Sequence, residues 1–423
     1  MVIWLIYPYG SIPGEGLRPD RPNMVARALA DAGHEVTWFG SSFEHRNKIM
    51  RSDEWKEIKF SDKNTTRLVP TSGYVKNISF DRIRSEKEYA RQIYLNRHKY
   101  AMPEMIIMAE PSVFISGQVV KIIKEFNTLF LLDMGDLWPE LFHLVLPKKL
   151  NILGKLIFSP FYARRRSLFQ KADAIIALSD SYRVLARKIA SNLPDEFLQT
   201  VYYGMDVGEQ RTLMNKSSDQ PEPLREIKKA DGELWAIYAS TLGNNYDLKT
   251  LLEAAIIIEQ KAIKIKILIA GDGPMKDYMV SFIKENDLKQ VVYIGNPNSA
   301  TIAAIFSFCD IGLSMYIKNS TVTMPIKAFH YFAAGLPVIN SLKGDLANIL
   351  SEHNIGLNYE PENVQSFVNA LETIASDPLK LREMAKNSYE LATTFDIDVQ
   401  YKKFSNIVDK MAQKKAHLSQ VKI

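Results

Sequence analysis

Residues 321–339 read TVTMPIKAFHYFAAGLPVI, and this stretch indicates a short capped helix followed by a buried strand. Thr323 is a suitable N-cap, and Pro325 suits the first helical turn. Gly335 and Pro337 then end the helix before an apolar strand begins. A short helix followed directly by a buried strand is typical of a parallel α/β sheet.

Lys327 stands in the first turn of this helix, where a cation opposes the helix macrodipole. The penalty is roughly 0.3–1 kcal/mol at an exposed site. A bound phosphate would make both the dipole and the ammonium favourable, because helix N-termini attract anions. The stretch therefore predicts an anion site at this helix start. The alternative is a solvated surface lysine.

The composition is that of an ordinary soluble globular protein, with 46% hydrophobic and 24% charged residues among 423. This length suffices for two domains, and no segment reaches the roughly 18 apolar residues that a membrane-spanning helix needs. Residues 1–7 look like a first strand rather than a secretion signal, so we expect a cytoplasmic protein. The net charge of +5 weakly favours an anionic partner such as a nucleotide and does not indicate nucleic acid.

Short apolar runs alternate with longer mixed segments along the whole chain, as in parallel sheets with crossover helices. The runs are 2–7, 35–39, 105–109, 129–132, 174–178, 200–203, 234–239, 265–270, 291–294, 310–315, 338–340 and 356–359. This pattern predicts an α/β protein with two Rossmann-like, doubly wound parallel-sheet domains facing a central cleft. We expect a hinge over 204–206 and 210–231, and variable helices and loops over 41–102.

A glycine-bearing loop, residues 9–21, follows the first strand. Gly14 and Gly16 would let backbone amides approach a ligand, and Arg18 and Arg21 add positive charge nearby. As a pattern this loop is weak, because a plain tight turn explains the glycines nearly as well. Residues 271–274, Gly-Asp-Gly-Pro, predict a second strand-to-helix turn at the crevice wall of the second domain.

Residues 131–140 read LLDMGDLWPE and place two carboxylates at the end of a first-domain strand, where acid/base groups lie in such sheets. Asp136 is the candidate acid/base residue, and the alternative is that its carboxylate only caps or stabilises a loop. The histidines are scattered without ligand spacing, so we expect no metal site. We expect no cofactor either.

Taken together, these segments resemble the retaining glycosyltransferases of family 4, which have the GT-B architecture, and especially the bacterial branch that builds lipopolysaccharide and capsule. The landmarks are residues 14–21, 136–140, 172–179, 203–206, 248–254, 271–274 and 325–339. The resemblance implies an N-terminal acceptor domain over 1–205 and a C-terminal nucleotide-sugar domain over 206–390. It also implies a helical segment over 391–423 that crosses back to the first domain.

The resemblance also assigns roles to particular residues. Asp136 would orient the acceptor or handle its proton, and Lys327 would stabilise the departing diphosphate. The amides around Thr323 and Met324 would share that task, and His330 would face the ribose. The donor-binding set implied in this way is Gly14, Gly16, Thr241, Thr323, Met324, Lys327 and His330.

This chain departs from the family pattern at four positions. Val322 and His330 stand where the family has two glutamates separated by seven residues. Thr241 and Tyr246 stand where relatives carry an arginine and a lysine. The donor sugar, and retention against inversion at the anomeric carbon, therefore stay open. One hypothesis is that Val322 faces a deoxy position of the sugar, since a hydroxyl buried against valine would lack a partner.

The function predicted from the resemblance is sugar transfer from a nucleotide-diphosphate donor to a glycan or polyprenyl-diphosphate-linked acceptor, in bacterial surface polysaccharide synthesis. The basic segment 141–171 would dock on the anionic inner face of the plasma membrane, or is simply a solvated helix face. Two alternatives to an active transferase remain. They are a catalytically silent nucleotide-sugar-binding subunit and a nucleotide-sugar epimerase, which would need more carboxylate and histidine pairs.

Overall fold

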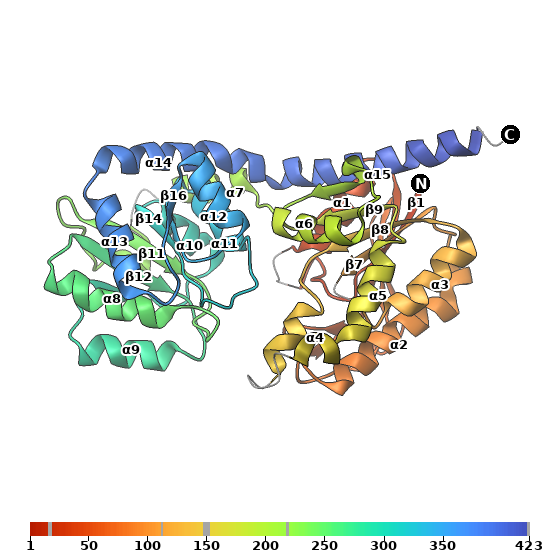
Figure 1. Ribbon diagram of the computed structural model, residues 1–423, viewed down its shortest axis with the longest axis horizontal. Helices are drawn as coiled ribbons and strands as arrows, with labels where there is room; N and C mark the ends of the chain where they lie inside the picture. The colour runs from red at the N-terminus through yellow and green to blue at the C-terminus, as the bar shows by residue number, and fades with distance from the viewer. Residues whose placement is uncertain (16–18, 111–112, 147–152, 217–219, 421–423) are drawn as a thin grey trace. The chain divides into compact units, whose positions relative to one another are not determined.

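The computed structural model describes residues 1–15, 19–110, 113–146, 153–216 and 220–420 (Figure 1). Contacts among them divide the chain into two units. The first comprises Met1–Tyr203 and the residues from Gln400 onward, and the second comprises Gly204–Val399. The last helix, α15 (Ile397–Gln420), therefore begins in the second unit and continues in the first. The ranges 1–205, 206–390 and 391–423 remain a proposal about the roles of these parts.

The first unit is built on an eight-stranded sheet of order β10-β9-β8-β7-β1-β2-β6-β5, parallel except for the β5–β6 pair. Its strands are β1 (Val2–Ile6), β2 (Glu35–Ser41), β5 (Lys56–Ser61), β6 (Asn64–Val69), β7 (Met105–Glu110), β8 (Leu129–Met134), β9 (Ala174–Ala177) and β10 (Leu198–Thr200). A separate two-stranded ribbon pairs β3 (Phe43–Glu44) with β4 (Ile49–Met50).

Helices cover both faces of this sheet, which is why its central strands are near-continuous apolar runs. The helices are α1 (Arg21–Asp31), α2 (Phe80–Asn96), α3 (Ser116–Phe126), α4 (Gly154–Ile157), α5 (Ser159–Phe169) and α6 (Asp180–Ile189). One core joins Trp4 and Phe39 to residues of α2, α3, α5 and α6. The rings of Trp4 and Phe39 meet edge to face, 5.0 Å between centroids. Burying each such side chain contributes roughly 1.5–3 kcal/mol.

A buried ion pair joins three parts of the first unit. The Arg21 guanidinium donates to both oxygens of Asp133 at 2.6 and 2.7 Å, and the Tyr7 hydroxyl donates to the same carboxylate. The guanidinium carbon also lies 5.7 Å from the ring centroids of Tyr401 and Phe404 on α15. The prediction that Arg21 adds free positive charge to the glycine loop is therefore wrong, because Asp133 neutralises it. Arg18 lies outside the described residues.

The second unit is a six-stranded parallel sheet of order β13-β12-β11-β14-β15-β16. Its strands are β11 (Leu234–Ala239), β12 (Ile265–Ala270), β13 (Val291–Tyr293), β14 (Ile311–Ser314), β15 (Val338–Asn340) and β16 (Gly356–Asn358). Counted from β11, the order is 3-2-1-4-5-6, that of dinucleotide-binding sheets. The strand order reverses between β11 and β14, so this edge is the topological switch point.

Helices pack on both faces of the second sheet as well (Figure 1). They are α7 (Val207–Asn215), α8 (Leu248–Gln260), α9 (Lys276–Glu285), α10 (Ser299–Phe306), α11 (Ile326–Ala333), α12 (Asp345–His353), α13 (Val364–Ala375) and α14 (Pro378–Leu391). Residues of α8, α9 and α13 share one core with the sheet. The predicted fold class, two doubly wound parallel-sheet units, is confirmed.

Three local expectations differ from the structure. The strand expected at 200–203 is β10, which ends at Thr200. Residues 41–102 contain not only α2 and loops but also β5 and β6, which extend the sheet. The pattern of β5 is polar because it is an edge strand with mostly exposed side chains. The expected hinge over 210–231 is partly helical, since α7 runs to Asn215 and a 3₁₀ turn occupies Glu222–Leu224.

The turn after β12 depends on a glycine. Gly271 has φ of +139°, and a Cβ there would lie 1.9 Å from the Ser240 carbonyl oxygen. We therefore expect Gly271→Ala to lower the free energy of unfolding by ~2 kcal/mol or more, through strain and backbone displacement. Gly243→Ala is the matched control, because its Cβ would meet nothing closer than 3.7 Å. Urea unfolding of both variants tests this, and equal stability would contradict it.

Candidate active site

Helix α11 starts one residue after a proline. Pro325 is the N-cap, with extended backbone angles, and the helix begins at Ile326. The prediction that Thr323 is the N-cap is wrong. Thr323 lies two residues earlier, and its carbonyl accepts a hydrogen bond from the Leu346 amide at 2.9 Å. The Ala328 amide donates to the Pro325 carbonyl at 3.0 Å. The Ile326 and Lys327 amides precede the first i→i−4 bond of the helix, and the positive end of the helix dipole favours an anion there.

The second residue of α11, Lys327, carries a buried ammonium. Its Nζ has no hydrogen-bond partner among the described residues. Three aromatic rings surround it, with centroids 4.8, 4.6 and 4.6 Å away in Tyr238, Tyr246 and Tyr316. Burial lowers the pKa of Lys327 to about 7, and ring faces compensate the lost hydration only in part. The alternative of a solvated surface lysine is therefore excluded.

The ammonium lies at the switch point of the sheet. Tyr238 belongs to β11, and Tyr316 follows β14 by two residues. A ring on α11 holds the helix there, because the Tyr331 hydroxyl lies 3.2 and 3.3 Å from the carbonyl oxygens of Ile237 and Leu313 on these two strands. Ligands of open α/β sheets bind in this crevice. The helix start and Lys327 are thus in the place where a phosphate-bearing ligand is expected.

The other predicted donor-binding residues of the second unit lie around this point. The exposed Thr241 follows β11, and its carbonyl accepts a hydrogen bond from the Tyr238 hydroxyl at 3.0 Å. Tyr238 thus contacts both this loop and the Lys327 ammonium. Met324 is half-buried just before α11. His330 lies one turn after Lys327, with Nδ1 3.1 Å from Oε1 of Gln210.

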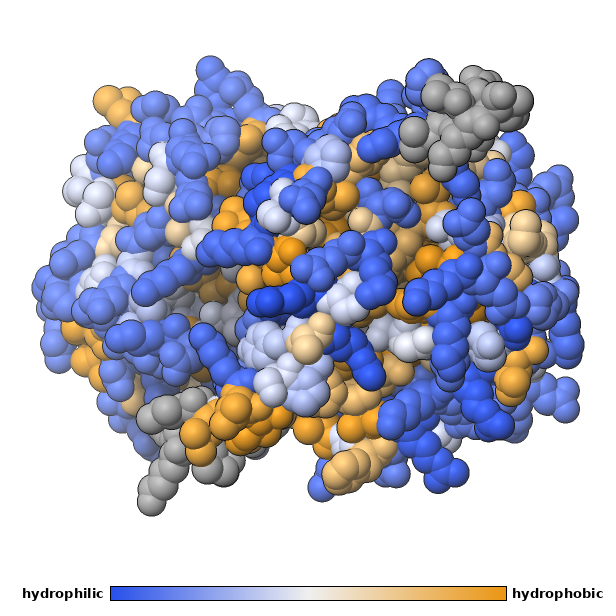
Figure 2. All heavy atoms as spheres, turned by 45° about the vertical axis from the view of Figure 1, so that its right-hand side comes forward, coloured by the Kyte–Doolittle hydropathy of each residue, from blue (hydrophilic) through white to orange (hydrophobic). Residues whose placement is uncertain are grey.

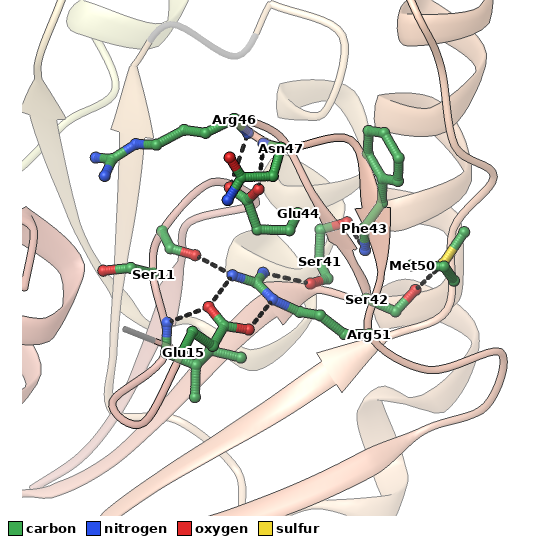
Figure 3. Close-up of polar contacts among 12 residues, drawn as sticks. Ser11, Glu15, Ser41, Ser42, Phe43, Glu44, Arg46, Asn47, Met50 and Arg51 are labelled. Atoms are coloured by element: carbon green, nitrogen blue, oxygen red, sulfur yellow. Dashed lines mark hydrogen bonds and ion pairs between the residues drawn. The ribbon is translucent and has the colours of Figure 1, made fainter. Parts of the chain in front are cut away.

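The glycine loop of the first unit is braced by an arginine (Figure 3). Arg51 donates to both carboxylate oxygens of Glu15 at 2.6 and 2.7 Å, and to the Gly10 carbonyl at 2.7 Å. The same carboxylate accepts the Ile12 amide at 2.8 Å. The Ser11 and Glu15 amides also donate within the loop, to the Asp20 carboxylate and the Ile12 carbonyl, so three of its amides are already bound there. Gly14 has a positive φ of 99°, and Gly16 lies outside the described residues.

Asp136 follows β8 and keeps exposed surface. Protein packed around the carboxyl nevertheless raises its pKa by desolvation, and the Arg82 guanidinium opposes this shift. The preceding residue is fixed to the neighbouring strand, because the Gly135 amide donates to the Glu110 carbonyl at 2.9 Å. The first unit thus places a carboxyl at the carboxyl edge of its sheet, as predicted, but the acceptor role itself stays a prediction.

Glu110, the last residue of β7, is a second carboxyl at this edge that sequence reasoning missed. It is 2% exposed, and neither carboxylate oxygen has a hydrogen-bond partner among the described residues. Burial raises the pKa of Glu110 to about 8, where Arg165 opposes the shift and Glu140 and Asp136 add to it. Arg165 is itself bound to Glu140 at 2.6 and 2.8 Å. Glu110 is therefore mostly protonated at pH 7.

The basic segment 141–171 is only partly available to a membrane. Arg165 is buried against Glu140, and Arg164 donates to the Val113 carbonyl at 2.7 Å. Arg166, Lys155 and Lys171 are exposed, and Lys148 and Lys149 lie outside the described residues. Leu153, Leu156 and Ile157 add exposed apolar surface. Figure 2 shows that apolar side chains reach the surface in patches separated by hydrophilic ones.

Part of this chain is similar in sequence to known glycosyltransferases. Residues 219–391 match the family model described as glycosyl transferases group 1. An uncharacterized glycosyltransferase of Methanocaldococcus jannaschii is 25% identical over 188 residues, which are 44% of this chain and 47% of that protein. The aligned segment thus spans about half the length of this relative.

Two solved structures match nearly the whole chain. Anabaena HepE in complex with UDP aligns with a TM-score of 0.65 and 13% identity, over 97% of this chain and 99% of that one. WaaG, a glycosyltransferase involved in lipopolysaccharide biosynthesis, aligns with a TM-score of 0.59 and 13% identity, over 96% and 99%. The chain has the GT-B fold. This fold prediction is confirmed, and the family match supports the prediction of a sugar-transferring enzyme. The polysaccharide branch stays a prediction.

The described residues include neither a membrane-spanning helix nor a metal-ligand cluster. None of their helices is long and apolar enough to cross a bilayer. Within the same part of the chain, no three histidine, cysteine or acidic side chains lie together as ligands for a metal ion.

Proposed function

We propose that this chain is a glycosyltransferase whose second unit binds a nucleoside-diphosphate sugar and whose first unit binds the acceptor. One observation carries the proposal. An ammonium that has no hydrogen-bond acceptor among the described residues is buried beside a helix N-terminus, at the switch point of a dinucleotide-type sheet. A diphosphate would supply the acceptor oxygens that Lys327 lacks. HepE, which has the same fold, is solved in complex with UDP, and this supports a nucleoside diphosphate as the ligand of the second unit.

The proposed reaction is transfer without a metal ion. The bond between the anomeric carbon and the diphosphate oxygen breaks, and the acceptor oxygen bonds to that carbon. Lys327 and the first amides of α11 would stabilise the charge on the leaving diphosphate, as fixed dipoles do in a site that excludes water. Asp136 would orient the acceptor hydroxyl or take its proton. Retention at the anomeric carbon is what the family resemblance implies.

The position of Lys327 would also compensate for one departure from the family pattern, the missing lysine at position 246. Tyr246 stands where relatives carry a lysine, and losing a charged hydrogen bond there costs about 1.5–3 kcal/mol. The Lys327 ammonium lies 4.6 Å from the Tyr246 ring. We propose that the positive charge has moved from the loop to the helix, so that donor binding is kept by a different residue. His330 would remain beside the ribose, and Val322, which is 37% exposed, beside the sugar.

The proposed setting is the cytoplasm, at the inner face of the plasma membrane, with a glycan or polyprenyl-diphosphate-linked acceptor. The exposed basic and apolar side chains of α4 and α5 support peripheral contact with anionic lipid. WaaG, which shares the fold, supports a role in surface polysaccharide synthesis.

A thermal-shift panel with UDP, GDP, TDP and their sugars tests donor binding. A ligand at one hundred times its dissociation constant stabilises by about 2.7 kcal/mol, so the correct donor should stand out clearly. The absence of any shift would contradict the proposal.

Product analysis with the selected donor separates the alternatives. A transferase forms a glycosylated acceptor, and an epimerase changes the donor without one. A silent subunit, which the missing glutamates at Val322 and His330 would favour, binds the donor and converts nothing.

A further inference from the structure

A hollow of about 60 Å³ opens beside the start of α2 in the first unit. Six apolar side chains form most of its wall, namely Ile78, Ile83, Val113, Phe114, Trp138 and Phe142. Trp138 and Phe142 meet edge to face, with centroids 4.5 Å apart, so this part of the wall is fixed by ring packing.

The polar residues of the wall are occupied with one another. Arg82 donates to Glu86 at 3.0 Å and to the Asn77 carbonyl at 3.0 Å. Glu86 also accepts from the Tyr9 hydroxyl. Ser79 caps α2 by accepting the Arg82 amide at 3.2 Å, and its hydroxyl donates to a backbone carbonyl. The surface that this hollow offers a ligand is therefore apolar, and a sugar hydroxyl buried there would lose its hydrogen bonds.

The size of the hollow limits its occupant. One water needs about 10–15 Å³ of such volume, so 60 Å³ admits on the order of four to six heavy atoms. A pyranose ring with its hydroxyl groups is larger than this. A branched five-carbon unit fits, and it carries no polar atoms.

Two residues of the wall relate the hollow to the predicted acceptor carboxyl. Trp138 follows Asp136 by two residues, and Arg82, which lines the hollow, is the charge that acts on the Asp136 carboxyl. Ile78 lines the hollow and is 66% exposed, and Phe80, two residues later at the start of α2, is 89% exposed. A chain that leaves the hollow would therefore meet further apolar side chains.

We propose that this hollow holds an isoprenyl unit of a prenyl-phosphate-type acceptor, with the rest of the hydrocarbon lying over Ile78 and Phe80. The proposal rests on the proposed transferase function and names the part of the acceptor that the first unit recognises. The apolar walls favour a hydrocarbon over a sugar, and the volume of the hollow accommodates one five-carbon unit. The hollow thereby sets the acceptor beside Asp136.

The test measures binding of alkyl phosphates of increasing length to the full chain, by calorimetry and tryptophan fluorescence. The series is inorganic phosphate, methyl phosphate, isopentenyl phosphate and geranyl phosphate, all below their micellar concentrations. Each buried methylene should raise affinity by up to about fourfold. We expect isopentenyl phosphate to bind at least ~10-fold more tightly than methyl phosphate. Affinity that does not change along the series would overturn the proposal.

A pair of variants on α2 and its approach locates the effect. Ile78→Asp places a charge at the mouth of the hollow, at a residue exposed enough to leave folding intact, and should remove most of the gain from the hydrocarbon. Leu95→Asp is the matched control, since Leu95 is 56% exposed and does not line the hollow. Equal binding by the two variants would contradict the assignment. Donor binding measured on the same samples separates failure of this proposal from failure of the transferase function.

Discussion

Lys327→Met should lower the rate of sugar transfer about 10²–10³-fold, the loss seen when one charge-stabilising donor is removed from an active site. The same change should raise the stability of the ligand-free protein. The folded pKa of about 7 lies below the usual 10.5, so the unfolded chain binds the extra proton between these values. The destabilisation by the buried ammonium is thus complete below pH 7 and fades as the pH rises to 10.5.

Stability and turnover should therefore move in opposite directions in this variant. Methionine keeps the length of the stem, and the gain should be on the order of a few kcal/mol at pH 7. Urea unfolding at pH 7 and 10, with initial rates of transfer, measures both effects. Lys289→Met is the control, because the Lys289 side chain is 74% exposed and should change neither. Unchanged turnover in Lys327→Met would remove this residue from the site.

Glu110→Gln should make the protein more stable than the wild type in alkaline solution but not in acid. The folded pKa of about 8 lies above the ordinary 4.5 of a glutamate, because the carboxyl is buried and no described residue forms a hydrogen bond with it. The unfolded chain therefore releases this proton near pH 4.5, while the native state holds it until about pH 8. Wild-type stability should fall through this window and stay low above it.

The difference between Glu110→Gln and the wild type should grow by a few kcal/mol from pH 4 to pH 9. Any fixed cost of burying the amide is the same at both ends, so the pH dependence is the informative quantity. Chemical denaturation across this range measures it. Glu35→Gln, which changes an exposed carboxyl of the same unit, should leave the profile parallel to that of the wild type. A parallel profile for Glu110→Gln as well would show that its carboxyl titrates normally.

The regular parts of the fold could be predicted because buried parallel strands have an unambiguous sequence pattern. β11, β12 and β15 have the predicted bounds, since each is a mostly apolar run, interrupted only by Lys266 in β12 and ended by Asn340 in β15. β5 was missed because an edge strand exposes its side chains and so lacks that pattern. Thr323 was assigned as the N-cap from residue preference alone, whereas the extended backbone at Pro325 takes that position.

Only part of the candidate site could be predicted from the sequence, because its residues are distant along the chain. The anomalous charge of Lys327 in a first helical turn pointed to the helix that carries the buried ammonium, because this signal is local. The ring cage around it joins residues 238, 246 and 316, and nothing local in the sequence brings these together. Glu110 is the last residue of β7. The rule that acid/base groups lie at the ends of parallel strands, which singled out Asp136, could therefore also have found Glu110. Its missing partners could be recognised only in three dimensions.

The split of the first unit along the chain has a practical consequence for dissecting this protein. Arg21, which is paired with Asp133, lies against Tyr401 and Phe404, and the entire second unit separates these rings from it in sequence. A gene fragment that stops at Tyr203 would leave this charged pair facing water on one side. Independent production of the first unit therefore requires a fusion in which a short linker joins Tyr203 directly to the segment from Gln400.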